Sequence, residues 1–81
     1  MKLFLISQSV NNNYDTYDSA VVCANTKKEA RFIHPSGKKE WDGKFKEFDG
    51  WASAQEIKIE YLGEAKKSSI KGVICASFNA G

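Results

Sequence analysis

One short stretch of the sequence alternates strictly between apolar and charged side chains. Ile57, Ile59 and Tyr61 fall on one side of an extended chain, and the intervening Lys58 and Glu60 fall on the other. Successive side chains of a strand point to opposite faces, so this pattern is typical of a strand with one buried face and one face in water. The sequence therefore predicts a half-buried antiparallel strand here.

Three further segments have the character of strands. Residues 2–7 and 73–78 are apolar in both alternating sets, which is typical of strands that lie centrally or are covered on both sides. Residues 17–24 are predicted to pair with the first strand as a hairpin, after the turn-rich segment 9–16. With the alternating strand over 56–62 the sheet has four strands, and we expect the order 2-1-4-3, with the two fully apolar strands at the centre.

A single helix is predicted between the second and third strands. Thr26 and Glu29 fit a capping box, in which the hydroxyl accepts from a backbone amide and the carboxylate reaches back to the cap. Ala30 and Ile33 supply the buried side, and Pro35 ends the helix. A helix of about nine residues is marginal alone, so it must pack on the sheet.

These elements together predict an α+β domain: a four-stranded, mainly antiparallel sheet (ββαββ) with one helix packed across it. The segment 36–50 contains three glycines and is predicted to be a loop, with room for an extra helical turn at 44–48. A chain of 81 residues can bury one small core. We therefore expect a single domain, 1–81.

The sequence carries no motif for binding nucleotides, phosphate or metals. His34 is the only histidine, and Cys23 and Cys75 stand apart in apolar runs, so neither a zinc site nor a cysteine nucleophile is indicated. We therefore predict a non-enzymatic protein with no cofactor and no metal. The alternative is a small enzyme that uses His34 with Asp15 or Asp18.

The apolar segments and the net charge constrain the cellular location and the type of partner. The apolar run at the start of the sequence stops at Ser7, too early for a signal peptide, and no stretch approaches the ~20 apolar residues of a membrane span. The formal net charge of +2 is too small to indicate a polyanionic partner by itself. We expect a cytoplasmic protein that does not contact the membrane.

The first candidate for contact with a partner is a pair of Tyr-Asp dipeptides. Tyr14, Asp15, Tyr17 and Asp18 flank the start of the second predicted strand. Tyrosine offers contact area at low entropic cost, and a carboxylate fixes orientation, so these residues suit a recognition edge. The alternative is that the aspartates bond turn amides while Tyr17 covers the core.

The second candidate segment mixes aromatic residues with charges. Trp41, Phe45 and Trp51 are assigned to partner binding because aromatic side chains are enriched at protein interfaces. The alternative is that these three residues, together with Phe48, close the open face of the sheet. The sequence leaves both interpretations open.

Two alternative functions remain. A single-stranded nucleic-acid-binding accessory protein would use Lys38, Lys39, Lys44 and Lys46 for phosphates while neighbouring aromatic rings stack on bases. The same segment carries as many carboxylates as lysines, so its net charge is zero and a phosphate track is disfavoured. The other alternative is a structural oligomer that associates through the edge strand 56–62.

Several motifs resemble those of a family of small tailed-bacteriophage and prophage proteins. They are YDTYDSAVV over residues 14–22, IKIEYLG over 57–63 and ASFNAG over 76–81. The resemblance implies a phage protein that acts in the bacterial host cytoplasm, and it brings no catalytic or cofactor residues. Small phage proteins of this kind include inhibitors of host defence such as anti-CRISPR proteins. We therefore predict a binding protein that docks on a host or phage protein and blocks it.

Overall fold

The computed structural model describes residues 1–80. Its strands form one antiparallel sheet: β1 (Lys2–Ser7), β2 (Thr16–Ala24), β3 (Lys58–Glu64) and β4 (Gly72–Asn79). Between β2 and β3 lie the helix α1 (Lys27–Arg31) and the short 3-10 helix η1 (Ala54–Glu56). The predicted α+β class, with a four-stranded antiparallel sheet and one α-helix, is confirmed.

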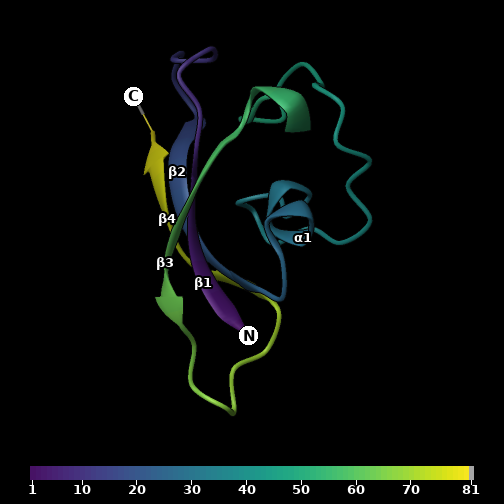
Figure 1. Ribbon diagram of the computed structural model, residues 1–81. Helices are drawn as coiled ribbons and strands as arrows, with labels where there is room; N and C mark the ends of the chain where they lie inside the picture. The colour runs from purple at the N-terminus through teal and green to yellow at the C-terminus, as the bar shows by residue number, and fades with distance from the viewer. Residues whose placement is uncertain (81) are drawn as a thin grey trace.

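The order of strands across the sheet is β3-β1-β2-β4, so β1 and β2 are central (Figure 1). The predicted order 2-1-4-3 is wrong, because the last strand lies at an edge and not beside the first. β4 pairs only with β2, and six of its eight residues are exposed. Its apolar character in both alternating sets therefore does not reflect a central position.

One face of the sheet is covered by α1 and by the long loop that we define as residues 32–53 (Figure 1). Phe4 and Ile6 of β1 and Val22 of β2 are buried under them, against Ala30 of α1. Burying side chains of this size stabilises the fold by about 1.5–3 kcal/mol each. The long loop thus covers the part of this face that a second helix covers in larger domains of this class.

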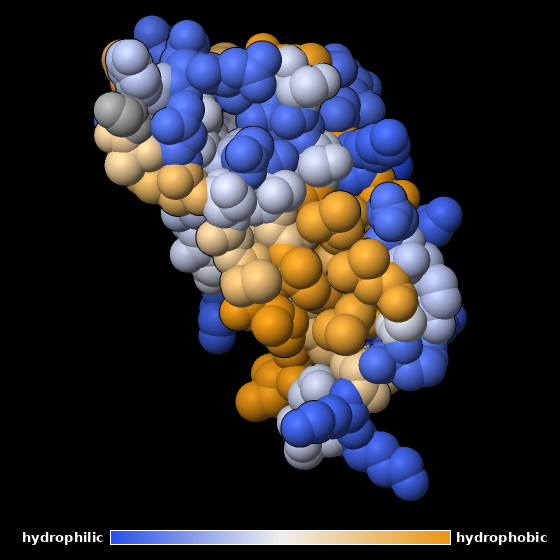
Figure 2. Space-filling model, turned by 90° about the vertical axis from the view of Figure 1, so that its left-hand side faces the viewer, coloured by the Kyte–Doolittle hydropathy of each residue, from blue (hydrophilic) through white to orange (hydrophobic). Residues whose placement is uncertain are grey.

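The opposite face of the sheet stays open over the residues that the structure describes. Leu5 pairs with Val21, and Val21 pairs with Cys75, so these three side chains form a row across β1, β2 and β4 on this face. Leu5 and Val21 are half-buried and Cys75 is exposed. Figure 2, which views the molecule from this side, shows apolar atoms gathered in one patch.

The helix α1 begins at the predicted cap. The Thr26 hydroxyl accepts from the Glu29 nitrogen at 3.1 Å, and the Glu29 carboxylate accepts from the Asn25 nitrogen at 3.0 Å, one residue before the cap. The helix is shorter than predicted and ends at Arg31. The Arg31 guanidinium then donates to the carbonyl of Ala54 at 2.7 Å, which ties the end of α1 to η1.

The predicted helical turn at 44–48 is wrong. The chain there forms only a turn, in which the Asp49 nitrogen donates to the Lys46 carbonyl at 3.2 Å. Phe48 has φ 66°, a left-handed conformation that an α-helix does not contain. Within residues 1–80, no helix is long and apolar enough to cross a membrane.

Candidate functional site

One buried side chain holds the turn between β1 and β2. The Gln8 amide donates to the carbonyls of Asn11 (2.8 Å) and Tyr17 (2.7 Å), and its oxygen accepts from the nitrogens of Val10 (2.9 Å) and Asn11 (2.8 Å). These bonds use all four hydrogen-bonding positions of a glutamine amide. The turn over residues 9–15 is therefore fixed to the end of the sheet.

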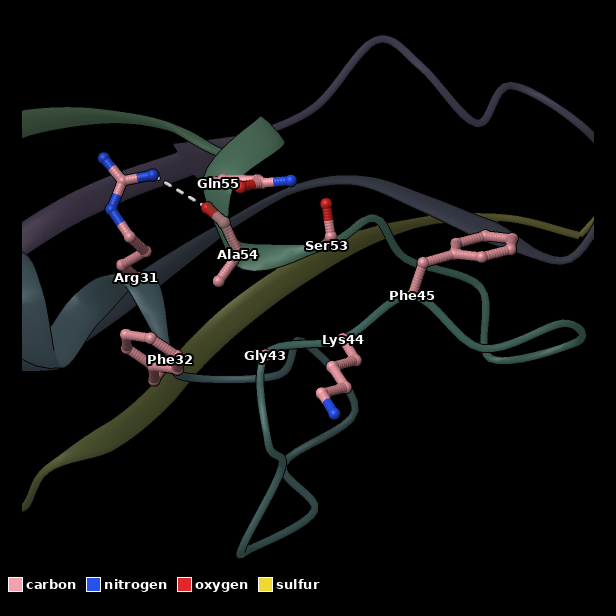
Figure 3. Close-up of a pocket in the computed structure, with 8 residues that line it drawn as sticks. All are labelled: Arg31, Phe32, Gly43, Lys44, Phe45, Ser53, Ala54 and Gln55. Atoms are coloured by element: carbon pink, nitrogen blue, oxygen red, sulfur yellow. Dashed lines mark hydrogen bonds between the residues drawn. The ribbon is translucent and has the colours of Figure 1, made fainter.

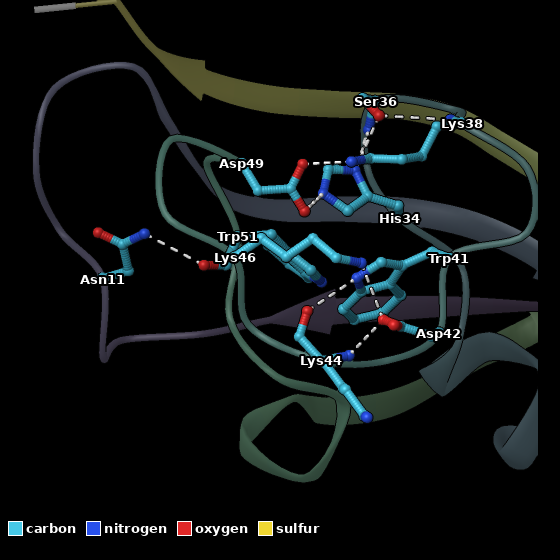
Figure 4. Close-up of polar contacts among 10 residues, drawn as sticks. All are labelled: Asn11, His34, Ser36, Lys38, Trp41, Asp42, Lys44, Lys46, Asp49 and Trp51. Carbon is cyan, nitrogen blue, oxygen red and sulfur yellow. Dashed lines mark hydrogen bonds and ion pairs between the residues drawn. The ribbon is translucent and has the colours of Figure 1, made fainter.

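Two hydrogen bonds join the long loop to this turn and to the start of β2. The Tyr17 nitrogen donates to the Gly50 carbonyl at 2.7 Å, and the Asn11 side-chain amide donates to the Trp51 carbonyl at 3.1 Å (Figure 4). Gly50 has φ 74°, and a β-carbon there would lie 2.9 Å from the Asp15 carbonyl oxygen. Only glycine lets the two segments approach this closely.

Exposed aromatic side chains gather around one hollow beside this junction. Tyr14, Phe45 and Phe48 are 75%, 57% and 97% exposed. The hollow has a volume of about 440 Å³, and Asp15 and Glu47 also line it. We call these five residues the aromatic surface. It brings together Tyr14, Asp15 and Phe45, which the sequence analysis placed in two separate segments.

Two residues of this surface, Glu47 and Phe48, were not predicted as partner-binding residues, and Phe48 is the most exposed aromatic of the surface. Its ring is almost fully exposed, so it contributes nothing to the core. Its φ of 66° is an outlier for a bulky residue. Backbone outliers of this kind concentrate at binding and active sites, where the surrounding structure holds them. Sequence offers only a weak signal for it, an aromatic residue followed by Asp-Gly.

His34 clamps the two ends of the segment that presents these rings (Figure 4). The imidazole Nδ1 accepts from the Ser36 nitrogen at 3.1 Å, so its Nε2 carries the proton and donates to the Asp49 carboxylate at 3.1 Å. Lys38 pairs with the same carboxylate. Burial lowers the pKa of His34, and the negative charge of Asp49 offsets this only in part. The ring is therefore neutral at pH 7.

The same contacts place three residue types of a nucleophilic triad in a row. The Ser36 hydroxyl lies 2.8 Å from His34 Nδ1, and Asp49 lies on the other side of the ring. This nitrogen already accepts the Ser36 backbone amide, and His34 is 1% exposed. The Ser36 hydroxyl therefore competes with a backbone bond for its base. These contacts fix the position of the loop relative to His34.

Four of the predicted partner-binding residues do not join the aromatic surface. Trp41 and Trp51 are 7% and 1% exposed, and both belong to the core. Tyr17 is half-buried and packs edge-on against His34, with ring centroids 6.2 Å apart. Asp18 is exposed but does not line the hollow. Core closure, the alternative interpretation, thus describes both tryptophans. The partner-binding assignment of Tyr17 and Asp18 stays a prediction.

The four lysines of the nucleic-acid alternative form no common track. Lys38 and Lys46 each pair with a carboxylate of the same loop (Figure 4). Lys39 and Lys44 line two separate hollows. Trp41, which would stack on a base, is buried. A groove that follows a phosphate backbone needs adjacent unpaired cations and exposed rings, so this arrangement does not favour the alternative.

A second hollow, of about 420 Å³, shares Phe45 with the first and also contacts Arg31 of α1 (Figure 3). Phe32 and Gly43 form part of its wall, and a β-carbon on Gly43 would lie 2.5 Å from the Phe32 ring. The one guanidinium beside it, that of Arg31, already donates to the Ala54 carbonyl. This hollow lies between the end of α1 and the loop, and Arg31 Nη1 beside it is already bonded to the carbonyls of Ala54 and Ile57.

The fold and the surface define a small α+β domain with an open four-stranded sheet and an aromatic surface where β1 passes into β2. No protein-family model, curated protein or solved structure matches the chain. Among residues 1–80, no group of three or more His, Cys, Asp or Glu side chains is placed to hold a metal ion.

Proposed function

We propose that this chain is a non-enzymatic binding protein that docks on another protein through the aromatic surface and blocks the site it covers. The observation that carries the proposal is the display of Phe48, whose ring is 97% exposed on backbone with φ 66°. The left-handed conformation costs about 1–2 kcal/mol, and the fold gains no burial in return. Contact of the ring with another molecule would supply that burial.

The exposed rings of the aromatic surface, and the hydrogen bonds that hold their segments in place, favour a protein partner. Tyr14, Phe45 and Phe48 project around an open hollow, as aromatic anchors do in protein interfaces. The Gln8 amide and the backbone bond from Tyr17 to Gly50 hold both segments before any partner arrives. A preformed surface loses less conformational entropy on binding, which strengthens association.

The charge around the hollow indicates the chemistry of the partner. Asp15 and Glu47 line it, and no lysine or arginine does. A basic side chain is attracted both to these carboxylates and to the faces of the aromatic rings. We therefore propose a contact segment with an apolar side chain for the hollow and an adjacent lysine or arginine.

The biological setting of this binding rests on the resemblance of the sequence to small phage proteins. On that basis we propose a host or phage protein as the partner, in the bacterial host cytoplasm. Inhibition of host defence, as by anti-CRISPR proteins, is the activity to assay first. It would be measured as the survival of a targeted phage in cells that express the chain.

The test compares capture by matched variants of the tagged, full chain in bacterial cells. Phe48→Ala and Glu47→Lys are expected to reduce the recovered partner at least about tenfold, because interface anchors contribute ~2 kcal/mol or more. Ile70→Ala is the control, since Ile70 is 82% exposed in the connection between β3 and β4, away from the surface. Equal recovery by all three variants, each folded by circular dichroism, would refute the proposal.

A further inference from the structure

The two edge strands of the sheet differ in how they are protected. β3 carries the charged residues Lys58, Glu60 and Glu64 along its length. β4 has the sequence GVICASFN, with no charge and no proline. Charged side chains and prolines are the main devices that keep an edge strand from pairing with another strand. β4 therefore presents an unprotected edge, whereas β3, the strand expected to mediate association, does not.

We propose that β4 pairs antiparallel with β4 of a second copy of this chain, so that two sheets join into one. The register of β4 against β2 shifts opposite Val21 and Val22, which places a bulge at Ile74. After this bulge, β4 continues over residues 75–79 without a further extra residue of its own, a length typical of short strands in sheets. A second register shift lies opposite Ser77 and Phe78, and there the extra residue, Asp18, belongs to β2. A two-fold axis through the middle of residues 75–79 passes through Ser77.

This register makes the strand complementary to itself. Ser77 lies opposite Ser77 of the second copy, and Phe78 lies opposite Ala76. Phe78 is 49% exposed in the single chain. The small Ala76 of the second copy leaves space for this ring to pack across the interface, and the two-fold symmetry forms the Phe78–Ala76 contact twice. No charge opposes a like charge across the axis, because β4 has none. These features favour a second copy over an unrelated strand, and symmetric dimers are the commonest oligomers.

The first test is the association of the full chain, measured by sedimentation equilibrium from micromolar to millimolar concentration. The apparent mass is expected to rise from 9.0 kDa toward twice that value. Ser77→Lys is expected to weaken association at least tenfold, because two lysines would face each other at the axis. Leu62→Lys is the control, since it adds the same charge at a 47% exposed position on β3. A monomer at millimolar concentration, or equal effects of the two variants, would overturn the proposal.

A second measurement needs no variant. Hydrogen exchange of the unmodified chain is expected to show protection of β4 amides that rises with protein concentration, while protection in β3 stays constant. Concentration-dependent protection in β3, or in neither strand, would contradict pairing through β4. The docking variants Phe48→Ala and Glu47→Lys lie off β4, so a failure of the proposed binding function leaves this result unaffected.

Discussion

The carbonyl oxygen of Asp15 lies 2.9 Å from the position that a β-carbon on Gly50 would occupy. This approach brings the turn between β1 and β2 against the long loop, with the Tyr17 nitrogen bonded to the Gly50 carbonyl beside it. The aromatic surface exists only because these two segments meet. Its shape therefore depends on a residue that has no side chain.

Gly50→Ala is expected to destabilise the fold more than the same substitution at Gly37. Both glycines have positive φ, 74° and 83°, so alanine at either position costs about 1–2 kcal/mol. A β-carbon at Gly37 meets nothing within 4 Å, whereas at Gly50 it meets the Asp15 carbonyl. The contact should add about 1–3 kcal/mol, measured by urea unfolding. Equal losses for the two variants would show that the contact relaxes freely.

Phe48→Gly is expected to separate stability from binding. Glycine adopts a φ of 66° without strain, and the ring it replaces is 97% exposed. The free energy of unfolding should stay constant or rise by up to about 1 kcal/mol, while binding of the partner is lost. Thermal unfolding and a binding assay on one sample measure both quantities. A fall in the melting temperature would mean that the ring supports the fold after all.

Acidification is expected to weaken the clamp around His34 in two steps. Burial lowers the pKa of His34 below 6.5. Burial opposes ionisation of Asp49, but bonds from Lys38 and His34 outweigh it and hold the pKa of Asp49 below 3.8. The unfolded chain therefore binds protons more readily than the folded chain at both sites. The contributions of His34 and Asp49 to the free energy of unfolding are consequently lost as pH falls.

The loss of stability from protonation of His34 should begin below pH 6.5 and continue through its folded-state pKa. The loss from protonation of Asp49 should begin below pH 3.8. Urea unfolding across this range measures the loss, and His34→Gln should remove the first step. An NMR titration of the imidazole is the direct check. A His34 pKa at or above 6.5 in the folded chain would contradict the prediction.

Both tryptophans are expected to be shielded from a neutral quencher such as acrylamide. Trp41 is 7% exposed and Trp51 is 1% exposed, so quenching in the folded chain should be several-fold weaker than in denaturant. The Trp41→Phe variant isolates Trp51, which should be the better protected of the two. Strong quenching in the folded state would mean that both indoles are exposed and again candidates for partner binding.

Individual strands and the helix cap could be predicted from the sequence, because they depend on the side chains of neighbouring residues. The alternation around Ile59 and the apolar run over residues 2–7 both mark real strands, and Thr26 caps α1. The order of the strands could not be predicted in this way. Periodicity reports which face of a strand is apolar, and β4 is apolar without being central.

The candidate site was predicted in part. Tyr14, Asp15 and Phe45 do share one surface, but the tryptophans named with them are buried. Composition cannot distinguish a core ring from an exposed one in a loop whose path depends on positive φ angles. Five residues of the long loop have such angles: Gly37, Glu40, Gly43, Phe48 and Gly50. The sequence indicates the three glycines as candidates for positive φ, but not Glu40 or Phe48.

Within the long loop, residues 44–49 lie between two main-chain hydrogen bonds. The Ala54 nitrogen donates to the Gly43 carbonyl at 2.7 Å, as the Tyr17 nitrogen does to that of Gly50. These bonds use only backbone atoms, so residues 44–48 can be diversified without removing either bond or the Asp49 partner of His34. A library of pentapeptides grafted over residues 44–48 would make the domain a scaffold for selecting new binders.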